Sequence, residues 1–94
     1  MGKISEKRMA GARDLGTIVA YRLFMKFLNP KNRGETFTWV GMRAYVLDMV
    51  MAQVSAALPE SCPVGIVKSL VDIAQKHAGK AFDEAMRDSG LSGP

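Results

Sequence analysis

The side chains best suited to nucleophilic chemistry are Cys62 and His77, the one cysteine and the one histidine of the chain. A thiol nucleophile is activated by an adjacent base such as histidine. Fifteen residues along one helix separate two positions by about 22 Å, so a helix that spans both residues keeps them apart. One cysteine and one histidine also exclude a disulfide framework and multi-cysteine or multi-histidine metal sites. We expect a structural Cys62, a half-buried His77, no enzymatic activity, no metal and no cofactor.

Residues 11–17 (GARDLGT) carry the two glycines of a phosphate-binding loop. That loop needs a lysine directly after its second glycine and a strand before its first, and this segment has neither. We therefore interpret Gly11 and Gly16 as sites of close helix approach or of flexibility at the start of the first helix. The adjacent acids Asp83 and Glu84 diverge by about 100° on a helix, so they do not form a proton-sharing pair.

A better-formed candidate site surrounds the connection between the first two predicted helices. Lys31 and Arg33 lie in this connection, and two threonines add hydroxyl groups where the next helix begins. Free backbone N–H groups at a helix N-terminus bind phosphate or carboxylate. The residues of this candidate nucleic-acid or anion site are Lys26, Lys31, Arg33, Thr36, Thr38 and Arg43. In the alternative interpretation, Lys26 and Lys31 simply offset the negative end of the first helix.

The charge is unevenly divided along the chain. Residues 1–47 hold nine basic and three acidic residues, a charge of +6, whereas residues 48–94 hold four basic and six acidic residues, a charge of −2. A basic half attracts phosphate or an acidic protein surface. The alternative interpretation is a solvated charge without such a partner, because no basic block of about five or six residues occurs.

Two breaks divide the chain into three predicted helices. They are residues 29–34 (NPKNRG) and 59–63 (PESCP), both rich in residues that end helices. We expect helices over 5–28, from 36 or 38 to 58, and over 61–88, with Ser5 and Ser61 as N-caps. Gly79 leaves open a split of the last helix, and residues 36–40 leave open a short edge strand. The chain is predicted to be one all-α domain over 1–94, a bundle of three or four helices with a frayed tail at 89–94.

The first two predicted helices carry more apolar surface than such a bundle buries. Each helix needs an apolar face over a third to a half of its circumference. Between 39 and 58, Arg43, Asp48 and Ser55 are nearly all that remains for water. Phe37 and Trp39 are placed to stack on a base or to anchor a partner chain, unless Trp39 is a core residue. The predicted partner-binding residues are Phe37, Trp39, Met42, Leu47 and Met51.

Surplus apolar surface is best buried against another chain. A second copy in a two-fold dimer is the commonest solution, and a groove that docks a different protein is the alternative. The seven methionines suit either case, because methionine adapts to irregular surfaces. We expect a homodimeric, non-enzymatic regulatory or inhibitory protein that binds another protein through its first two helices.

The alternative function is nucleic-acid binding through the basic half and residues 31–39, with an affinity that falls steeply with salt. No signal peptide or membrane span is apparent in the sequence. Together with the single cysteine, this favours a cytoplasmic location without membrane contact.

Overall fold

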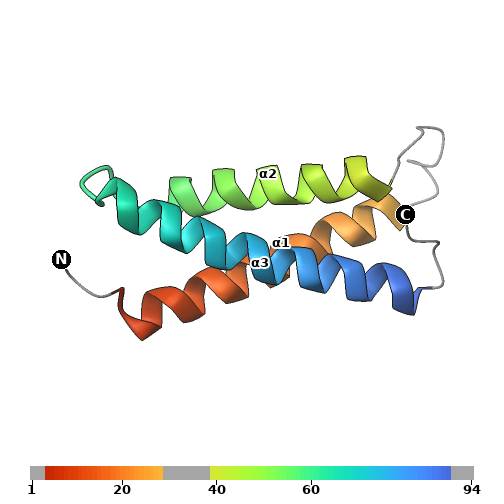
Figure 1. The fold of residues 1–94 in the computed structure, drawn as a ribbon. Coiled ribbons are helices and arrows are strands. Elements are labelled where there is room, and N and C mark those ends of the chain that lie inside the picture. The colour runs from red at the N-terminus through yellow and green to blue at the C-terminus, as the bar shows by residue number, and fades with distance from the viewer. Residues whose placement is uncertain (1–3, 29–38, 90–94) are drawn as a thin grey trace.

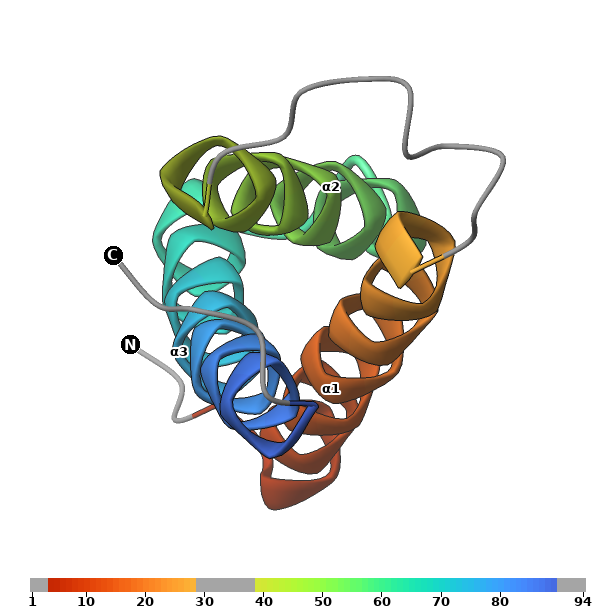
Figure 2. The ribbon, with the colours of Figure 1, turned by 90° about the vertical axis from the view of Figure 1, so that its right-hand side faces the viewer.

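The computed structural model describes residues 4–28 and 39–89, and these form three helices (Figure 1). α1 spans Glu6–Leu28, α2 spans Trp39–Ala57 and α3 spans Val64–Asp88. Viewed along the bundle, the helices stand at the corners of a triangle (Figure 2). No strand occurs in these two ranges, so the predicted all-α fold is confirmed.

The first two helices begin close to their predicted positions. Ser5 caps α1 as expected, because the Arg8 backbone N–H donates to Ser5 Oγ at 3.2 Å. α2 begins at Trp39, and Val40 is helical as well, so the strand considered for residues 36–40 does not include these two. Thr36 and Thr38, the two predicted starts of this helix, lie outside the described residues.

The prediction that Ser61 caps α3 is wrong. α3 begins at Val64, with Pro63 in the N-cap position and no side-chain cap. Cys62 precedes a proline and therefore avoids the helical region, which prevents an earlier start. Instead, the Cys62 backbone N–H donates to the Pro59 carbonyl at 2.9 Å and closes a turn.

The rest of α3 follows its predicted course without interruption. It runs straight through the buried Gly79, so the four-helix alternative is wrong. At its C-terminal end the Ser89 backbone N–H donates to the Ala85 carbonyl at 3.0 Å, and Ser89 Oγ donates to the Met86 carbonyl at 2.9 Å. Ser89 is therefore bonded to the helix end, and the remainder of the predicted frayed tail, 90–94, lies outside the described residues.

The core lies between the three helices and centres on Phe82 of α3, which is fully buried. Phe24 and Phe27 of α1 each meet the Phe82 ring edge-on, with ring centroids 6.5 Å apart. The other fully buried large side chains are Leu70, Val19, Val46 and Val50. The buried residues of α3, which include Leu70, Ala74, Ala78 and Phe82, lie along one side of the helix.

The two glycines of α1 have opposite surroundings. A Cβ at Gly16 would overlap the backbone of Ala74, so Gly16 allows α1 and α3 to cross closely, as predicted. A Cβ at Gly11 would meet nothing within 4 Å, so close approach is wrong for that residue. α1 and α2 touch near the C-terminal end of α1, where Phe27 packs on Tyr45, and they diverge toward its N-terminal end (Figure 1).

Candidate protein-binding surface

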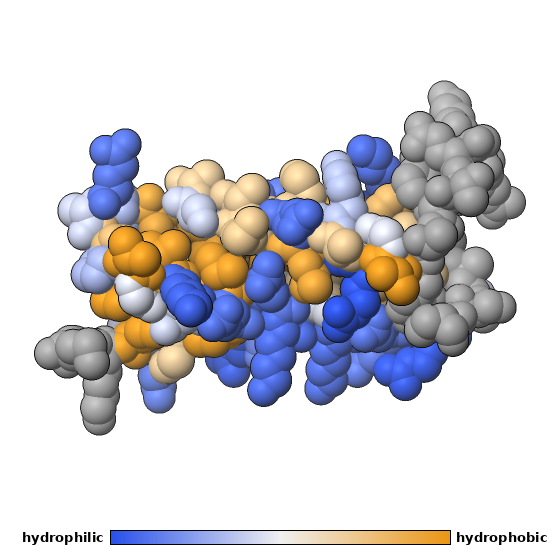
Figure 3. Space-filling model, turned by 45° about the horizontal axis from the view of Figure 1, so that its top comes forward, coloured by the Kyte–Doolittle hydropathy of each residue, from blue (hydrophilic) through white to orange (hydrophobic). Residues whose placement is uncertain are grey.

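The side of α2 that faces away from the core is apolar. We call it the α2 outer face, and its exposed apolar residues are Val40, Ala44, Tyr45, Met51, Ala52 and Ala56. Val40 is 68% exposed, Met51 45% and Tyr45 44%. In Figure 3 the apolar residues form a band along the upper part of the molecule, above hydrophilic side chains. Among the exposed residues described in α2, Asp48 carries the only charge.

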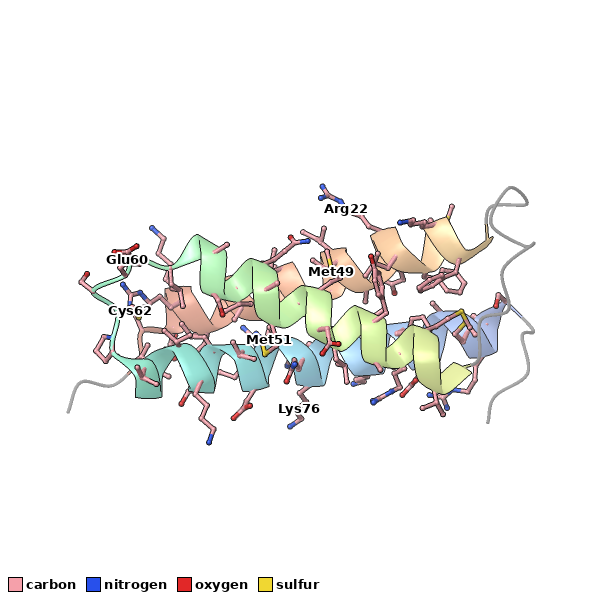
Figure 4. The ribbon with its side chains drawn as sticks, turned by 90° about the horizontal axis from the view of Figure 1, so that it is seen from above. Arg22, Met49, Met51, Glu60, Cys62 and Lys76 are labelled. Carbon is pink, nitrogen blue, oxygen red and sulfur yellow. The ribbon has the colours of Figure 1, made fainter. Side chains whose placement is uncertain are left out.

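This surface arises because α2 is apolar all round. Val46, Val50 and Val54 form its buried face and pack into the core. Residues two apart on a helix point in nearly opposite directions, at about 100° per residue. Met49 accordingly turns toward α1 and packs against the core, while Met51 lies on the other side of α2 (Figure 4). The neighbouring helices thus cover only part of the apolar circumference of α2.

The predicted partner-binding residues do not all reach this surface. Met51 is exposed, whereas Leu47 and Met42 are half-buried and Met42 packs against the core. The backbone carbonyl of Leu47 accepts a hydrogen bond from Gln75 Nε2 at 3.0 Å, which fixes this edge of α2 on α3. Phe37 lies outside the described residues, and Trp39 is described only as the first residue of α2.

The predicted partner-binding residues do not include the other exposed members of the α2 outer face. The available signal was spacing, because Val40, Ala44 and Met51 follow one another by four and seven residues and so share one side of a helix. That signal is ambiguous in a helix without a polar face. Whether these residues face the core or the solvent depends on the position of α3, and only the fold shows that position.

A smaller apolar group stands on α1. Ile18, Tyr21 and Met25 are exposed at spacings of three and four residues, and Met25 is 63% exposed. Asp14 and Arg22 are exposed on the same helix. Because charged residues interrupt this group, it is a less continuous apolar surface than the α2 outer face.

The predicted anion site is described at two of its six residues. Lys26 is exposed in the last turn of α1. Arg43 pairs with Asp83 of α3, with Nε 3.2 Å from Oδ1 and 3.4 Å from Oδ2. The guanidinium lies over Gly79, where a Cβ would come within 2.6 Å of Nη2. Arg43 therefore ties α2 to α3. The other four residues, Lys31, Arg33, Thr36 and Thr38, lie outside the described ranges.

Cys62 and His77 occupy different parts of the fold. Cys62 is on the α2–α3 connection, where Arg8 Nη1 lies 4.0 Å from Sγ (Figure 4). His77 is half-buried, as expected, and lines a hollow of about 480 Å³ between α1 and α3. The other residues around this hollow are Glu6, Met9, Ala10, Arg13, Ile73 and Lys76. Charges of both signs surround it, so it has no clear ligand class.

The described ranges, 4–28 and 39–89, contain no cluster of three or more histidine, cysteine, aspartate or glutamate residues placed to hold a metal ion. None of their helices combines the length and apolar character that a membrane crossing requires. The α2 outer face is therefore the most distinctive surface in this part of the chain.

No protein-family model, curated protein or solved structure matches this chain. Its function must therefore be inferred from its own surface. The strongest feature of that surface is a helix whose solvent side is apolar.

Proposed function

We propose that this chain is a small non-enzymatic regulatory or inhibitory protein that binds another protein through the α2 outer face. The observation that carries the proposal is the exposure of Val40, Tyr45 and Met51 along a helix side whose one charge is Asp48. Contiguous exposed apolar residues mark protein-binding sites. A partner helix that lies along α2 is the simplest complement to a surface of this shape.

The size of the surface fits a specific but moderate interaction. Full burial of a large apolar side chain contributes about 1.5–3 kcal/mol. Tyr45 and Met51 are already partly buried, so with Val40 they offer about 2–5 kcal/mol in total. The alanines at 44, 52 and 56 add little area but let a partner backbone approach closely. A partner that also covers the edges of α2 gains further affinity.

Asp48 argues for a different protein over a second copy. It stands midway along α2 and forms no ion pair with any described residue. A two-fold antiparallel pairing of two α2 outer faces, centred on the middle of α2, would place the two Asp48 carboxylates opposite each other, and facing like charges are destabilising. A partner helix with a lysine or arginine in its apolar face satisfies Asp48. The predicted homodimer remains the competing outcome.

The test uses synthetic amphipathic helical peptides of leucine and alanine that differ only at one central position, lysine or glutamate. Their affinity for the full chain is measured by fluorescence anisotropy. We expect the lysine peptide to bind about tenfold more tightly, because only lysine pairs with Asp48. Asp48→Asn should remove this preference. Equal binding of the two peptides by the unmodified chain contradicts the proposed partner chemistry.

Two methionines provide a matched control, because Met51 and Met25 are both exposed but lie on different helices. Met51→Asp should abolish peptide binding, and Met25→Asp should leave it unchanged. Light scattering on the same samples reports self-association. A dimer that Met51→Asp dissociates and Asp48→Asn strengthens would replace the proposed partner with a second copy.

A further inference from the structure

The divergence of α1 and α2 leaves an apolar hollow, which we call the α1–α2 wedge. It is about 340 Å³ in volume and lies toward the N-terminal end of α1. Its lining comes from all three helices and from the residue that follows α2: Arg8, Gly11, Ala12, Leu15, Val54, Ala57, Leu58 and Leu70. Ala12, Val54 and Leu70 are buried, so the floor of the wedge belongs to the core. Leu15 and Leu58 are partly buried and pack against that core.

The rim of the wedge consists of small residues. Gly11 and Ala57 are both exposed, and a side chain at Gly11 would enter open space. A glycine inside a helix costs about 1 kcal/mol relative to alanine. At Gly16 close contact with Ala74 explains the glycine, but no contact explains it at Gly11. The consequence of Gly11 is that the mouth of the wedge stays open.

The one charged group of the lining is Arg8. It is exposed and forms no ion pair with any residue that the structure describes. Its guanidinium Nη1 lies 4.0 Å from Cys62 Sγ, and a thiol sulfur is a weak acceptor. A guanidinium presents five N–H donors and pairs with a carboxylate through two parallel hydrogen bonds. Arg8 is therefore equipped to bind a carboxylate beside an apolar hollow.

We propose that the α1–α2 wedge binds a medium-chain fatty acid, with the alkyl chain on Leu15, Val54 and Leu70 and the carboxylate on Arg8. Small-molecule sites are hollows of about 300–1,000 Å³ with mainly apolar linings and few polar groups, and they occur between the helices of bundles. At about 340 Å³ the wedge is at the small end of this range, which favours a flexible aliphatic chain over a larger ring system. This site is separate from the α2 outer face and does not depend on the proposed function.

The experiment is a calorimetric titration of the full chain with decanoate, below the concentration at which micelles form. Decanol, which has the chain without the carboxylate, and inorganic phosphate, which has the charge without the chain, are the comparison ligands. We expect saturable one-to-one binding of decanoate and at least tenfold weaker binding of both comparison ligands. Decanol loses a charge-assisted hydrogen bond, which contributes that much, and phosphate loses the burial of the alkyl chain.

Two pairs of variants locate the site. Arg8→Gln should weaken decanoate binding about tenfold or more, whereas Lys7→Gln removes a neighbouring exposed cation and should have no effect. Gly11→Leu should block the mouth of the wedge and abolish binding. Gly65→Leu is its control, because Gly65 is also exposed in a helix with nothing within 4 Å of a Cβ. Circular dichroism establishes that each variant remains folded.

Absence of saturable decanoate binding would overturn the proposal. Binding that survives Gly11→Leu would also overturn it, because the ligand would then lie elsewhere. Binding that decanol matches, or that Arg8→Gln leaves unchanged, would overturn the assignment of the carboxylate to Arg8.

Discussion

α2 and α3 pack on the same core but differ in what they present to solvent. α3 buries a continuous apolar stripe that includes Leu70, Ala78 and Phe82, and charged residues such as Lys76 and Lys80 occupy its exposed side. α2 buries Val46 and its neighbours but leaves apolar side chains exposed as well. Apart from Val64, its first residue, which is 84% exposed, the composition of α3 is explained by folding alone. The composition of α2 is not, because an exposed valine or methionine adds little to the stability of the free chain.

The difference between α2 and α3 predicts that core residues determine stability and that residues of the α2 outer face do not. Phe82→Ala should lower the free energy of unfolding by about 3–5 kcal/mol, because it leaves a cavity where two rings of α1 pack. Met51→Ala, on the α2 outer face, should change it by less than about 1 kcal/mol. Urea denaturation followed by circular dichroism measures both values. Comparable losses would show that the α2 outer face is part of the stability-determining core.

The packing of α3 against α1 gives the next largest expected effect. Gly16→Ala should destabilise the fold by about 1–3 kcal/mol, because the new methyl group overlaps the Ala74 backbone, which cannot move aside. Gly11→Ala should instead stabilise it by about 0.5–1 kcal/mol, since the position is open and alanine favours helix. Thermal unfolding of the two variants compares them directly. A shift of the unfolding temperature in the same direction for both variants would contradict the described packing of α1.

The Arg43–Asp83 pair joins the two compared helices and should contribute little. Arg43 and Asp83 side chains are 40% and 30% exposed, and such pairs contribute about 0–1 kcal/mol. Gly79→Ala should shift the guanidinium, which is a flexible tip, while alanine improves helix propensity. We expect these effects to offset each other, so that the free energy of unfolding of Gly79→Ala changes by no more than about 0.5 kcal/mol. A loss as large as that of Gly16→Ala would mean that α2 depends on this pair for its position.

The smallest expected effect concerns nucleic acid. Arg43 of α2 is already paired with Asp83. We therefore expect the chain to show no salt-sensitive affinity for duplex or single-stranded DNA. Filter binding at two salt concentrations tests this. A steep salt dependence, with a slope of about −0.9 per neutralised phosphate, that Lys31→Ala and Arg33→Ala reduce would favour the nucleic-acid function instead.

The sequence predicted α3 better than α2 for a physical reason. In α3 the apolar residues recur on one side, so periodicity alone indicates the buried face. In α2 apolar residues surround the helix, and periodicity therefore could not distinguish the core side from the solvent side. Among the residues predicted to bind a partner, Met51 is exposed and Met42 packs against the core, and the exposed Val40 and Tyr45 were not among those residues.

Local signals also differed in how far they determined the structure. Ser5 capped α1 because nothing competed with it, whereas the cap predicted at Ser61 failed because Pro63 took the N-cap position. Gly79 left open a split of the last helix, but its role depends on Arg43, which is distant in sequence. Such a pairing of a glycine with a side chain from another helix is tertiary information that local sequence does not contain.

The most direct test of the account uses the methionines as probes, through methyl NMR spectra of the full chain labelled at methionine. The lysine-bearing helical peptide is titrated in, and three methyl groups are compared: Met51 on the α2 outer face, Met25 on α1 and Met86 in the core. We predict a saturable shift of the Met51 signal while Met25 and Met86 stay in place. A shift at Met25 with Met51 unmoved would contradict a binding role for the α2 outer face.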